Sequence, residues 1–377
     1  MRVVVIGSGI VGTSVAYECA KAGAKVVLLE AGRIAGGTST VSFAWTNATG
    51  KRPRAYFALN VAGMRAHLEL KRDFPDAPWF FQSGGFEWRT TPAGIAAFEE
   101  DVRQISEWGY GVEWVDRETV ARMEPDVTAT GEGPIAYFAE EGWVDPALYS
   151  AWLIRAATSR WGAEVFTGAR VVAVETQNGR VVGVRTADGT QIAADHVVNC
   201  TGGLSGLELG DAPALPLAST VGVLAFTPPV ALTLRSHVHA DDLDMRPDGA
   251  GRIMIHKVSV DDTLSEPQTL ATDGPEATAL LEAARAVLTG LEMVPIEAIR
   301  STVRPIPADG LTCAGEMPGI SGYSVAVTHS GATIAPQLGK VVADEVVRGR
   351  THAEMESFRP SRFFATGNSG TPRRAVA

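Results

Sequence analysis

Three glycines near the start of the chain stand at a spacing that suits phosphate binding. Gly7, Gly9 and Gly12 follow an apolar run at 3–6 that is typical of a buried parallel strand, and a second apolar run ends at Glu30. Such glycines allow a tight turn, close approach of backbone N–H groups to a pyrophosphate, and close packing of the next helix. An acidic residue about 20 positions further on can bind a ribose hydroxyl. A structural glycine turn is the alternative, but strand, helix and acid together predict an adenine-dinucleotide site.

The elements that must position this turn can be read from periodicity. Helical patterns, with Thr91 as an N-cap and Pro146 at a first helical position, occupy 11–22, 54–74, 92–108, 146–160, 276–289 and 332–348. Strand patterns occupy 79–88, 169–176, 180–186, 190–194, 196–200, 252–260 and 322–328. Hairpin turns are predicted at 178–179, 188–189 and 248–251, where Asn-Gly, Asp-Gly and Gly residues can supply positive φ angles. The pattern predicts an α/β domain followed by a domain built on antiparallel strands.

Composition restricts the class of protein further. The net charge of −10, without a Lys/Arg run, argues against nucleic-acid or anionic-membrane partners. The three cysteines are far apart and odd in number, which favours buried free thiols in a reducing compartment. No apolar run approaches the 18 or so residues of a membrane span, and the first strand leaves no room for a signal peptide. We therefore expect a cytoplasmic protein.

Several motifs, taken in order, carry a resemblance to a known family. They are the glycine turn with Glu30, GTS at 37–39, EGWVDP at 141–146, VVNCTGG at 197–203, RPIPADG at 304–310 and THSG at 328–331. Together they resemble the FAD-dependent D-amino-acid oxidase superfamily over nearly the whole chain. The resemblance implies a Rossmann-like FAD-binding domain, made from 1–48, 150–215 and 300–366, and an α+β substrate domain, made from 49–149 and 216–299. Residues 367–377 are expected to form a frayed tail.

The resemblance also implies which residues bind FAD, without a covalent link. Backbone of the glycine turn would hold the pyrophosphate, Glu30 the ribose, and Val171 the adenine. The Thr/Ser loop and the turn before the last helix would lie along the flavin, where a helix N-terminus stabilises negative charge on the reduced ring. The full expected set is Gly7, Gly9, Ile10, Val11, Gly12, Glu30, Ala31, Thr38, Ser39, Thr40, Val171, Thr201, Gly202, Ser330, Gly331, Ala332 and Thr333.

Substrate-binding candidates come from the same resemblance. Arg304 matches an arginine that clamps the substrate carboxylate, for which a planar guanidinium is well suited. Arg300 is a rival, and a structural salt bridge is the alternative for either. His329 is expected near the flavin, and Trp45 and His256 are expected near the substrate, although each could have a structural role.

Other polar residues are alternative candidates for the substrate site or for a metal site. Lys257 competes with His256, because strand register decides which of the two points inward. His237 and His239, followed by Asp241 and Asp242, could ligate a metal, but we interpret them as exposed strand histidines and expect no metal.

The resemblance implies oxidation of the C–N bond of an amino acid or related amine that carries a carboxylate. The α-hydrogen would pass as hydride to flavin N5, and the resulting imine would hydrolyse, so that alignment matters more than a strong base.

Ile253 stands about where sarcosine oxidase has its oxygen-activating lysine, and Cys313 lies past the position of an FAD tether. The electron acceptor is therefore left open among oxygen, a quinone and a redox protein. Alternatives are a flavoprotein subunit of a hetero-oligomeric dehydrogenase and an FAD monooxygenase, although Asp309-Gly310 reverses the Gly-Asp order of the latter.

Overall fold

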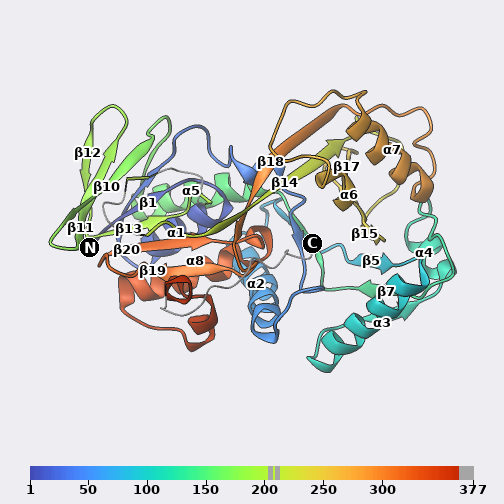
Figure 1. The fold of residues 1–377 in the computed structure, drawn as a ribbon, viewed down its shortest axis with the longest axis horizontal. Helices are drawn as coiled ribbons and strands as arrows, with labels where there is room; N and C mark the ends of the chain where they lie inside the picture. The colour runs from blue at the N-terminus through green and yellow to red at the C-terminus, as the bar shows by residue number, and fades with distance from the viewer. Residues whose placement is uncertain (203–206, 209–212, 365–377) are drawn as a thin grey trace.

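The fold consists of two lobes, each organised around its own large sheet (Figure 1). The computed structural model describes residues 1–202, 207–208 and 213–364. Gly203 of the VVNCTGG motif and the expected tail at 367–377 lie outside the described residues.

The first lobe is built on a sheet of six strands around the N-terminal strand. Its order is β19 (Cys313–Glu316), β20 (Tyr323–Val327), β13 (His196–Asn199), β1 (Arg2–Ile6), β2 (Lys25–Leu29) and β9 (Glu164–Phe166). All neighbours are parallel except β19 and β20. A parallel sheet must be covered on both faces, which explains why β1 and β2 are almost continuously apolar.

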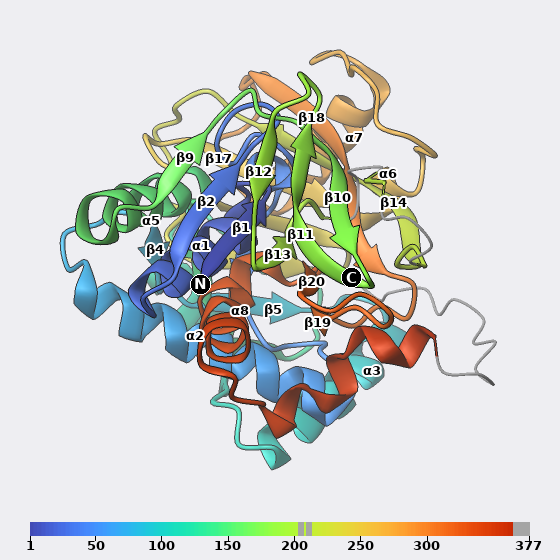
Figure 2. The ribbon, with the colours of Figure 1, turned by 90° about the vertical axis from the view of Figure 1, so that its left-hand side faces the viewer.

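The two faces of this sheet are covered by different structures. Val3 and Val5 pack toward a helical layer, whereas Val4 and Ile6 pack toward a meander, because successive strand side chains alternate. The helices are α1 (Ile10–Lys21), α2 (Arg54–Asp73), α5 (Pro146–Trp161) and α8 (Gly331–Arg348). The meander is β10 (Val171–Gln177), β11 (Arg180–Thr186) and β12 (Gln191–Ala193), and Figure 2 shows it in front of the sheet.

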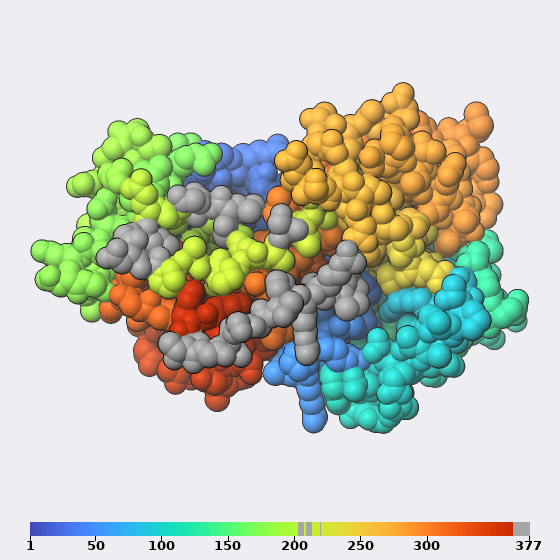
Figure 3. Space-filling model, in the orientation of Figure 1, coloured from blue at the N-terminus to red at the C-terminus, as the bar shows by residue number. Residues whose placement is uncertain are grey.

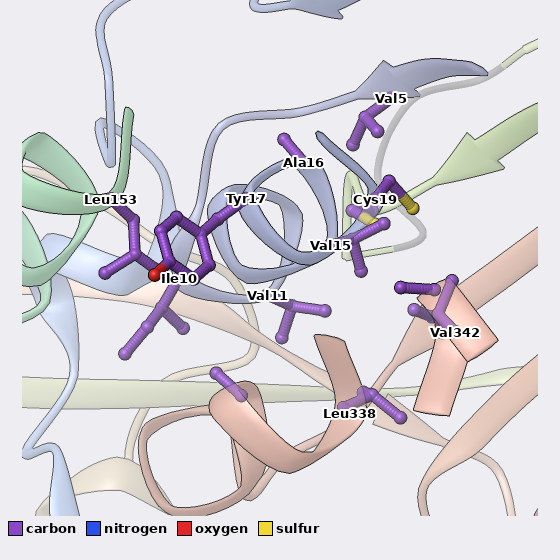
Figure 4. Packing of buried hydrophobic residues seen from close by; sticks show 14 of the residues in the cluster. Val5, Ile10, Val11, Val15, Ala16, Tyr17, Cys19, Leu153, Leu338 and Val342 are labelled. Carbon is purple, nitrogen blue, oxygen red and sulfur yellow. The ribbon is translucent and has the colours of Figure 1, made fainter. Parts of the chain in front are cut away.

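Close packing fixes α1 in the middle of the helical layer. Figure 4 shows Leu153 of α5 beside Tyr17, and Leu338 and Val342 of α8 on another side of α1. Cys19 lies fully buried in this core, and all three cysteines are buried and free, as the sequence predicted.

The second lobe is built on a sheet of eight strands. Its order is β18 (Ala298–Pro307), β14 (Leu217–Phe226), β17 (Ile253–Lys257), β16 (Leu243–Pro247), β15 (His237–Ala240), β5 (Gly85–Trp88), β7 (Ile135–Phe138) and β6 (Glu113–Val115). The sheet unites strands from the segments 49–149 and 216–299, and Figure 3 shows the teal part of the first segment and the orange part of the second together at one end of the molecule. β18 pairs with β14 along its full length and so continues the sheet beyond residue 300, where the sequence placed a domain boundary.

Helices and short elements complete this lobe. They are the helices α3 (Pro92–Glu107), α4 (Arg117–Met123), α6 (Val258–Asp261) and α7 (Pro275–Val287), and the 3₁₀ turn η1 (Thr38–Val41), which contacts β18. A small sheet of β3 (Trp45–Thr46), β8 (Gly142–Val144) and β4 (Phe80–Phe81) packs into the core of the first lobe through Phe80 and Val144. The 3₁₀ turns η2 (Ala353–Phe358) and η3 (Pro360–Phe363) lie against β19 of the first lobe. Thr91 caps α3 by accepting from Gly94 N, as predicted. Among the described residues, no helix combines the length and apolarity that a membrane crossing needs.

Three local predictions were wrong. The strand expected over 79–88 is two strands in different sheets, because Gly84 at φ 73° turns the chain between β4 and β5. The strand expected over 252–260 ends at Lys257 and continues as α6. At the Asp188-Gly189 turn only Gly189 has a positive φ, whereas both Asn178 and Gly179 do.

Candidate functional site

A cavity of about 720 Å³ is lined by residues of both large sheets. All the predicted site residues line this cavity except Gly12 and Thr40. The chain thus brings together the N-terminal glycine turn, the Thr/Ser loop, the end of β13, the start of α8 and part of β18. Of the two arginines considered for substrate binding, only Arg304 lines the cavity; Arg300 lies over the ring of Phe226.

The glycine turn is shaped by close backbone contacts. Gly7 has φ 95°, and a Cβ there would lie 2.9 Å from the Cys200 carbonyl oxygen. A Cβ on Gly12 would lie 1.9 Å from the Gly7 carbonyl oxygen, so α1 can approach β1 this closely only with glycine. Gly12 therefore packs the helix against the turn and does not line the cavity, which is one of the tasks expected of the third glycine.

The N-terminus of α1 has the features of an anion-binding site. Gly9 is its N-cap and provides no side-chain hydrogen bond, and the Ile10 N–H donates to Ser39 Oγ at 3.0 Å. Free N–H groups and the helix dipole at such a terminus favour negative charge. Nearby, Glu30 accepts from Ser8 N at 2.9 Å, from Ser8 Oγ at 2.8 Å and from Gly32 N at 2.8 Å. These bonds hold the carboxylate at the rim of the same cavity.

A second helix, α8, also begins at the cavity. Its N-cap, Ser330, exchanges a hydrogen bond of 2.7 Å with the Tyr56 hydroxyl, and Thr333 Oγ1 donates to the Trp45 carbonyl at 3.1 Å. Burial, assisted by three nearby cationic side chains, lowers the pKa of the preceding His329 to about 3. Those cations are Lys51, Arg304 and His256. His329 is therefore neutral at physiological pH.

Arg304 enters the cavity with part of its guanidinium already engaged. Nη2 donates to the Val221 carbonyl at 2.8 Å and to Asp261 Oδ2 at 2.7 Å, which uses both hydrogens of that nitrogen. Nε is buried without a partner. Gly222 lies beside this side chain, and a Cβ there would be in ordinary van der Waals contact with Arg304 Cδ at 3.4 Å. A carboxylate clamp by this residue stays a prediction, and in this geometry it would depend chiefly on Nη1.

Asp261 links Arg304 to a buried cluster on the sheet. His256 lies between two carboxylates, with Nε2 2.8 Å from Asp261 Oδ2 and Nδ1 2.9 Å from Asp244 Oδ2. Burial alone lowers the pKa of His256, but both bonds to carboxylates outweigh this effect and raise it to about 9. The imidazolium and Arg304 thus balance the two acids, as buried charges require. Lys257 instead pairs with Asp242 at 2.8 Å.

The histidines of β15 belong to the same cluster. His237 Nε2 lies 3.1 Å and His239 Nδ1 lies 2.6 Å from Asp244 Oδ1. The interpretation of these two as exposed strand histidines was wrong, because β15 is an inner strand of the sheet between β16 and β5. Within residues 1–202, 207–208 and 213–364, no group of His, Cys, Asp and Glu side chains is arranged to hold a metal ion.

Trp45 forms a wall of the cavity and is fixed from behind. Its Nε1 donates to Glu141 Oε2 at 2.8 Å, and its ring lies 4.0 Å from that of His237, centroid to centroid. The Tyr110 hydroxyl donates to the other Glu141 oxygen at 2.6 Å. Burial raises the pKa of Glu141 to about 8. The hydrogen bonds from Tyr110 and Trp45 lower this pKa, but they do not cancel the effect of burial.

Comparison with known proteins agrees with this architecture. The family model described as FAD dependent oxidoreductase matches residues 2–345. Glycine oxidase of Bacillus licheniformis is 27% identical over 375 residues, covering 95% of this chain and 96% of that protein. Glycine oxidase of Geobacillus kaustophilus superimposes with a TM-score of 0.81 at 22% identity over 100% of both chains. L-proline dehydrogenase of P. horikoshii superimposes with a TM-score of 0.83 at 18% identity, covering 96% and 97%.

The chain belongs to the FAD-dependent oxidoreductase family. The predicted superfamily, fold class and enzyme class are thereby confirmed, and the monooxygenase alternative loses its support. The residues present fit FAD: two uncapped helix N-termini face one cavity, and Glu30 stands at the end of β2. The α1 terminus would hold the pyrophosphate, and Glu30 the ribose. The α8 terminus would face the flavin, which supplies hydride acceptance when bound.

Several charged residues around the cavity were missed from the sequence. They include Lys51, Glu87 and Asp244, which line the cavity, Asp261 beside Arg304, and Glu141 behind Trp45. Glu141 stood in a motif of the family, but nothing marked it as a partner of Trp45. No local signal could have identified Asp261, because its partners Val223, His256 and Arg304 come from three different strands.

Proposed function

We propose that this FAD enzyme oxidises the C–N bond of an amine that carries a carboxylate. The α-hydrogen would leave as hydride to flavin N5, and the imine product would hydrolyse in water. The relatives named above are a glycine oxidase and an L-proline dehydrogenase, whose named substrates are both α-amino carboxylates.

The observation that carries this proposal is the position of Arg304. Its side chain lines the same cavity as His329 and the N-terminus of α8, where the flavin is expected. A cation there can bind a carboxylate through Nη1 and so align the α-carbon with the flavin. Asp261 holds the other amino group of the guanidinium, which fixes its direction.

The remaining residues favour the reaction by orientation and charge. The α8 N-terminus supplies N–H groups that stabilise negative charge gained by the flavin. Trp45, locked by Glu141, closes one side of the cavity and excludes water from it. His329 is neutral, so it adds no positive charge against an approaching amine. No residue needs to act as a strong base, because the departing hydrogen carries its electrons with it.

We also propose that FAD is bound without a covalent link. Cys313 is fully buried and does not line the cavity. Cys200 lines it, but burial raises the pKa of its thiol, which therefore stays protonated. Yellow colour released into the supernatant by acid precipitation would support this assignment. We also propose that the protein is cytoplasmic, because its three cysteines are free thiols, as is typical of a reducing compartment.

Anaerobic bleaching of the flavin absorbance tests the function. Amino acids and N-methylglycine should reduce the flavin, whereas matched amines without the carboxylate should do so far more weakly. Bleaching without an added protein would exclude dependence on a partner subunit, and reoxidation by air or by a quinone would identify the acceptor.

Arg304→Ala and Arg304→Lys then test the carboxylate assignment. The alanine variant should lose about 2–5 kcal/mol of substrate binding, because the carboxylate would stay semi-buried and unpaired. Lysine should restore part of this loss, since it also keeps a charge beside Asp261. Equal losses for substrates with and without a carboxylate would contradict the proposal.

A further inference from the structure

A second cation, Lys51, lines the cavity from the loop that precedes α2. In the described part of the chain, no carboxylate oxygen lies within the 4.0 Å of its Nζ that would make an ion pair. Its neighbour Arg52 differs, because it pairs with Asp101 at 3.0 Å and does not line the cavity. Lys51 is half-buried, and partial removal of its ammonium from water without an acidic partner lowers its pKa.

The two acids that raise the pKa of Lys51 electrostatically, Glu141 and Asp244, already have other partners. Both oxygens of Glu141 accept hydrogen bonds from Trp45 and Tyr110. Both oxygens of Asp244 face histidines at 2.6–3.1 Å. Three N–H groups of Lys51 are therefore left for a molecule that enters the cavity.

Glu87 is another acidic residue that lines the cavity, and it can contact a ligand in a different way. Glu87 accepts from Arg89 at 2.6 Å through Oε1, whereas its Oε2 is buried without a partner. That oxygen can accept from an N–H or O–H of a ligand, but it does not form an ion pair with Lys51.

Lys51 and Arg304 reach the cavity from different elements. Arg304 stands on β18, at the far edge of the eight-stranded sheet, and Lys51 stands on the loop between β3 and α2. Both nevertheless lie close enough to His329 to affect it electrostatically. Beside His329 the cavity thus offers Arg304 and Lys51 as two separate cations that can each bind an anionic group.

We propose that Lys51 binds a second acidic group of the substrate, so that the enzyme prefers amines carrying two carboxylates. This inference rests on the proposed function and on Arg304 as the anchor of the first carboxylate. Lys51 would then discriminate dicarboxylate amines from glycine-like amines of similar shape.

Matched pairs of N-substituted glycines test the inference on the FAD-loaded enzyme. The dicarboxylates are iminodiacetate, N-(2-carboxyethyl)glycine and N-(3-carboxypropyl)glycine, and their neutral counterparts are N-methyl-, N-ethyl- and N-propylglycine. Dissociation constants would come from the concentration dependence of anaerobic flavin reduction. At least one dicarboxylate should bind about 10- to 100-fold more tightly than its counterpart, as expected for a charge-assisted contact.

Substitutions of Lys51 test whether this side chain causes the preference for dicarboxylates. Lys51→Met should remove the preference while leaving FAD content, melting temperature and affinity for the neutral counterparts close to wild type. Lys51→Arg should keep most of it. Lys21→Met removes a surface lysine that pairs with Asp73 at 3.1 Å, and it should change neither affinity.

Three results would overturn the inference without touching the proposed function. They are equal affinity for both members of every pair, equal loss for both members in Lys51→Met, and an effect of Lys51→Met on flavin reoxidation alone. Failure of every carboxylate-bearing amine to reduce the flavin would instead overturn the proposed function, and this inference with it.

Discussion

The two sides of the cavity are built on different physical principles. On the side where we propose FAD, the cofactor side, the lining consists of glycines, hydroxyls and the backbone of two helix starts, all within short stretches of sequence. On the side where we propose the substrate, the substrate side, the contacts come from charged and polar side chains whose partners lie far along the chain, such as Arg304 with Asp261 and Trp45 with Glu141.

This difference has an energetic consequence. A backbone-built site tolerates changes of side-chain charge but not changes of backbone spacing. A site built from buried charges responds to pH and to removal of any one partner, because each charge depends on the others. We therefore expect the substrate side to show the largest effects of pH and of charge substitution.

The largest expected effect concerns Glu141. Its pKa in the folded protein is about 8, well above the ordinary 4.5, so the folded state retains a proton that the unfolded state loses. The resulting stability is complete below pH 4.5 and is lost as pH rises toward 8, by up to about 1.4 kcal/mol per pH unit. Glu141→Gln cannot titrate, so it should gain stability relative to wild type, by several kcal/mol in total, between pH 5 and 8.

Urea unfolding at a series of pH values measures this difference. Glu140→Gln, which alters the exposed neighbouring residue, should show the pH dependence of wild type. If the stability difference between Glu141→Gln and wild type were constant across the range, Glu141 would not hold a raised pKa.

A somewhat smaller effect is expected for Asp261→Asn. Asp261 is 3% exposed and accepts from Val223 N, His256 and Arg304, so its removal leaves two cations undercompensated. Breaking such a buried pair typically costs about 3–5 kcal/mol of unfolding free energy. Substrate affinity should fall as well, because Arg304 would lose its fixed direction.

Asp262→Asn provides the control, since Asp262 is exposed on the next position of the chain. Denaturant unfolding and anaerobic substrate titration should leave that variant close to wild type. A stability loss below about 1 kcal/mol in Asp261→Asn would show that the cluster readily reorganises.

The contrast between the two sides also explains what the sequence could predict. The glycine turn between β1 and α1, the strand that ends before Glu30, the meander turn at Asn178-Gly179 and the start of α8 were predicted correctly as local structure, because each depends on residues adjacent in the chain. The split of 79–88 was not foreseen: Phe80–Phe81 pairs with β8, and Gly85–Trp88 pairs with β15 and β7, so the partners lie far away in sequence.

The same reason applies to the site residues. Arg304 was identified through a motif, but its bond to Asp261 spans 43 positions and joins β18 to α6. The buried state of His237 depends on β15 lying between two other strands, which alternation of residues along β15 alone does not reveal.

On the cofactor side, backbone spacing should matter most. Gly12→Ala places a Cβ 1.9 Å from the Gly7 carbonyl oxygen, a rigid backbone atom, so α1 or the turn must shift. Such overpacking costs about 1–3 kcal/mol of stability, and FAD retention should fall because the pyrophosphate turn moves. Gly111→Ala, where a Cβ meets nothing within 4 Å, should leave both the FAD content and the melting temperature unchanged.

The smallest expected effect is that of Glu30→Ala on FAD affinity. Glu30 would lose its ribose contact together with the bonds from Ser8 and Gly32 that hold it in place, while the backbone contacts to the pyrophosphate remain. The loss should be about 1–3 kcal/mol, or about 5- to 150-fold in the dissociation constant measured by fluorescence titration of the apoprotein. Asp195→Ala removes a carboxylate that accepts from Arg2 N at 2.6 Å, at the other end of the same sheet. That control should weaken FAD binding little, because Asp195 does not line the cavity. Equal losses in the two variants would mean that Glu30 acts through the sheet and not on the ribose.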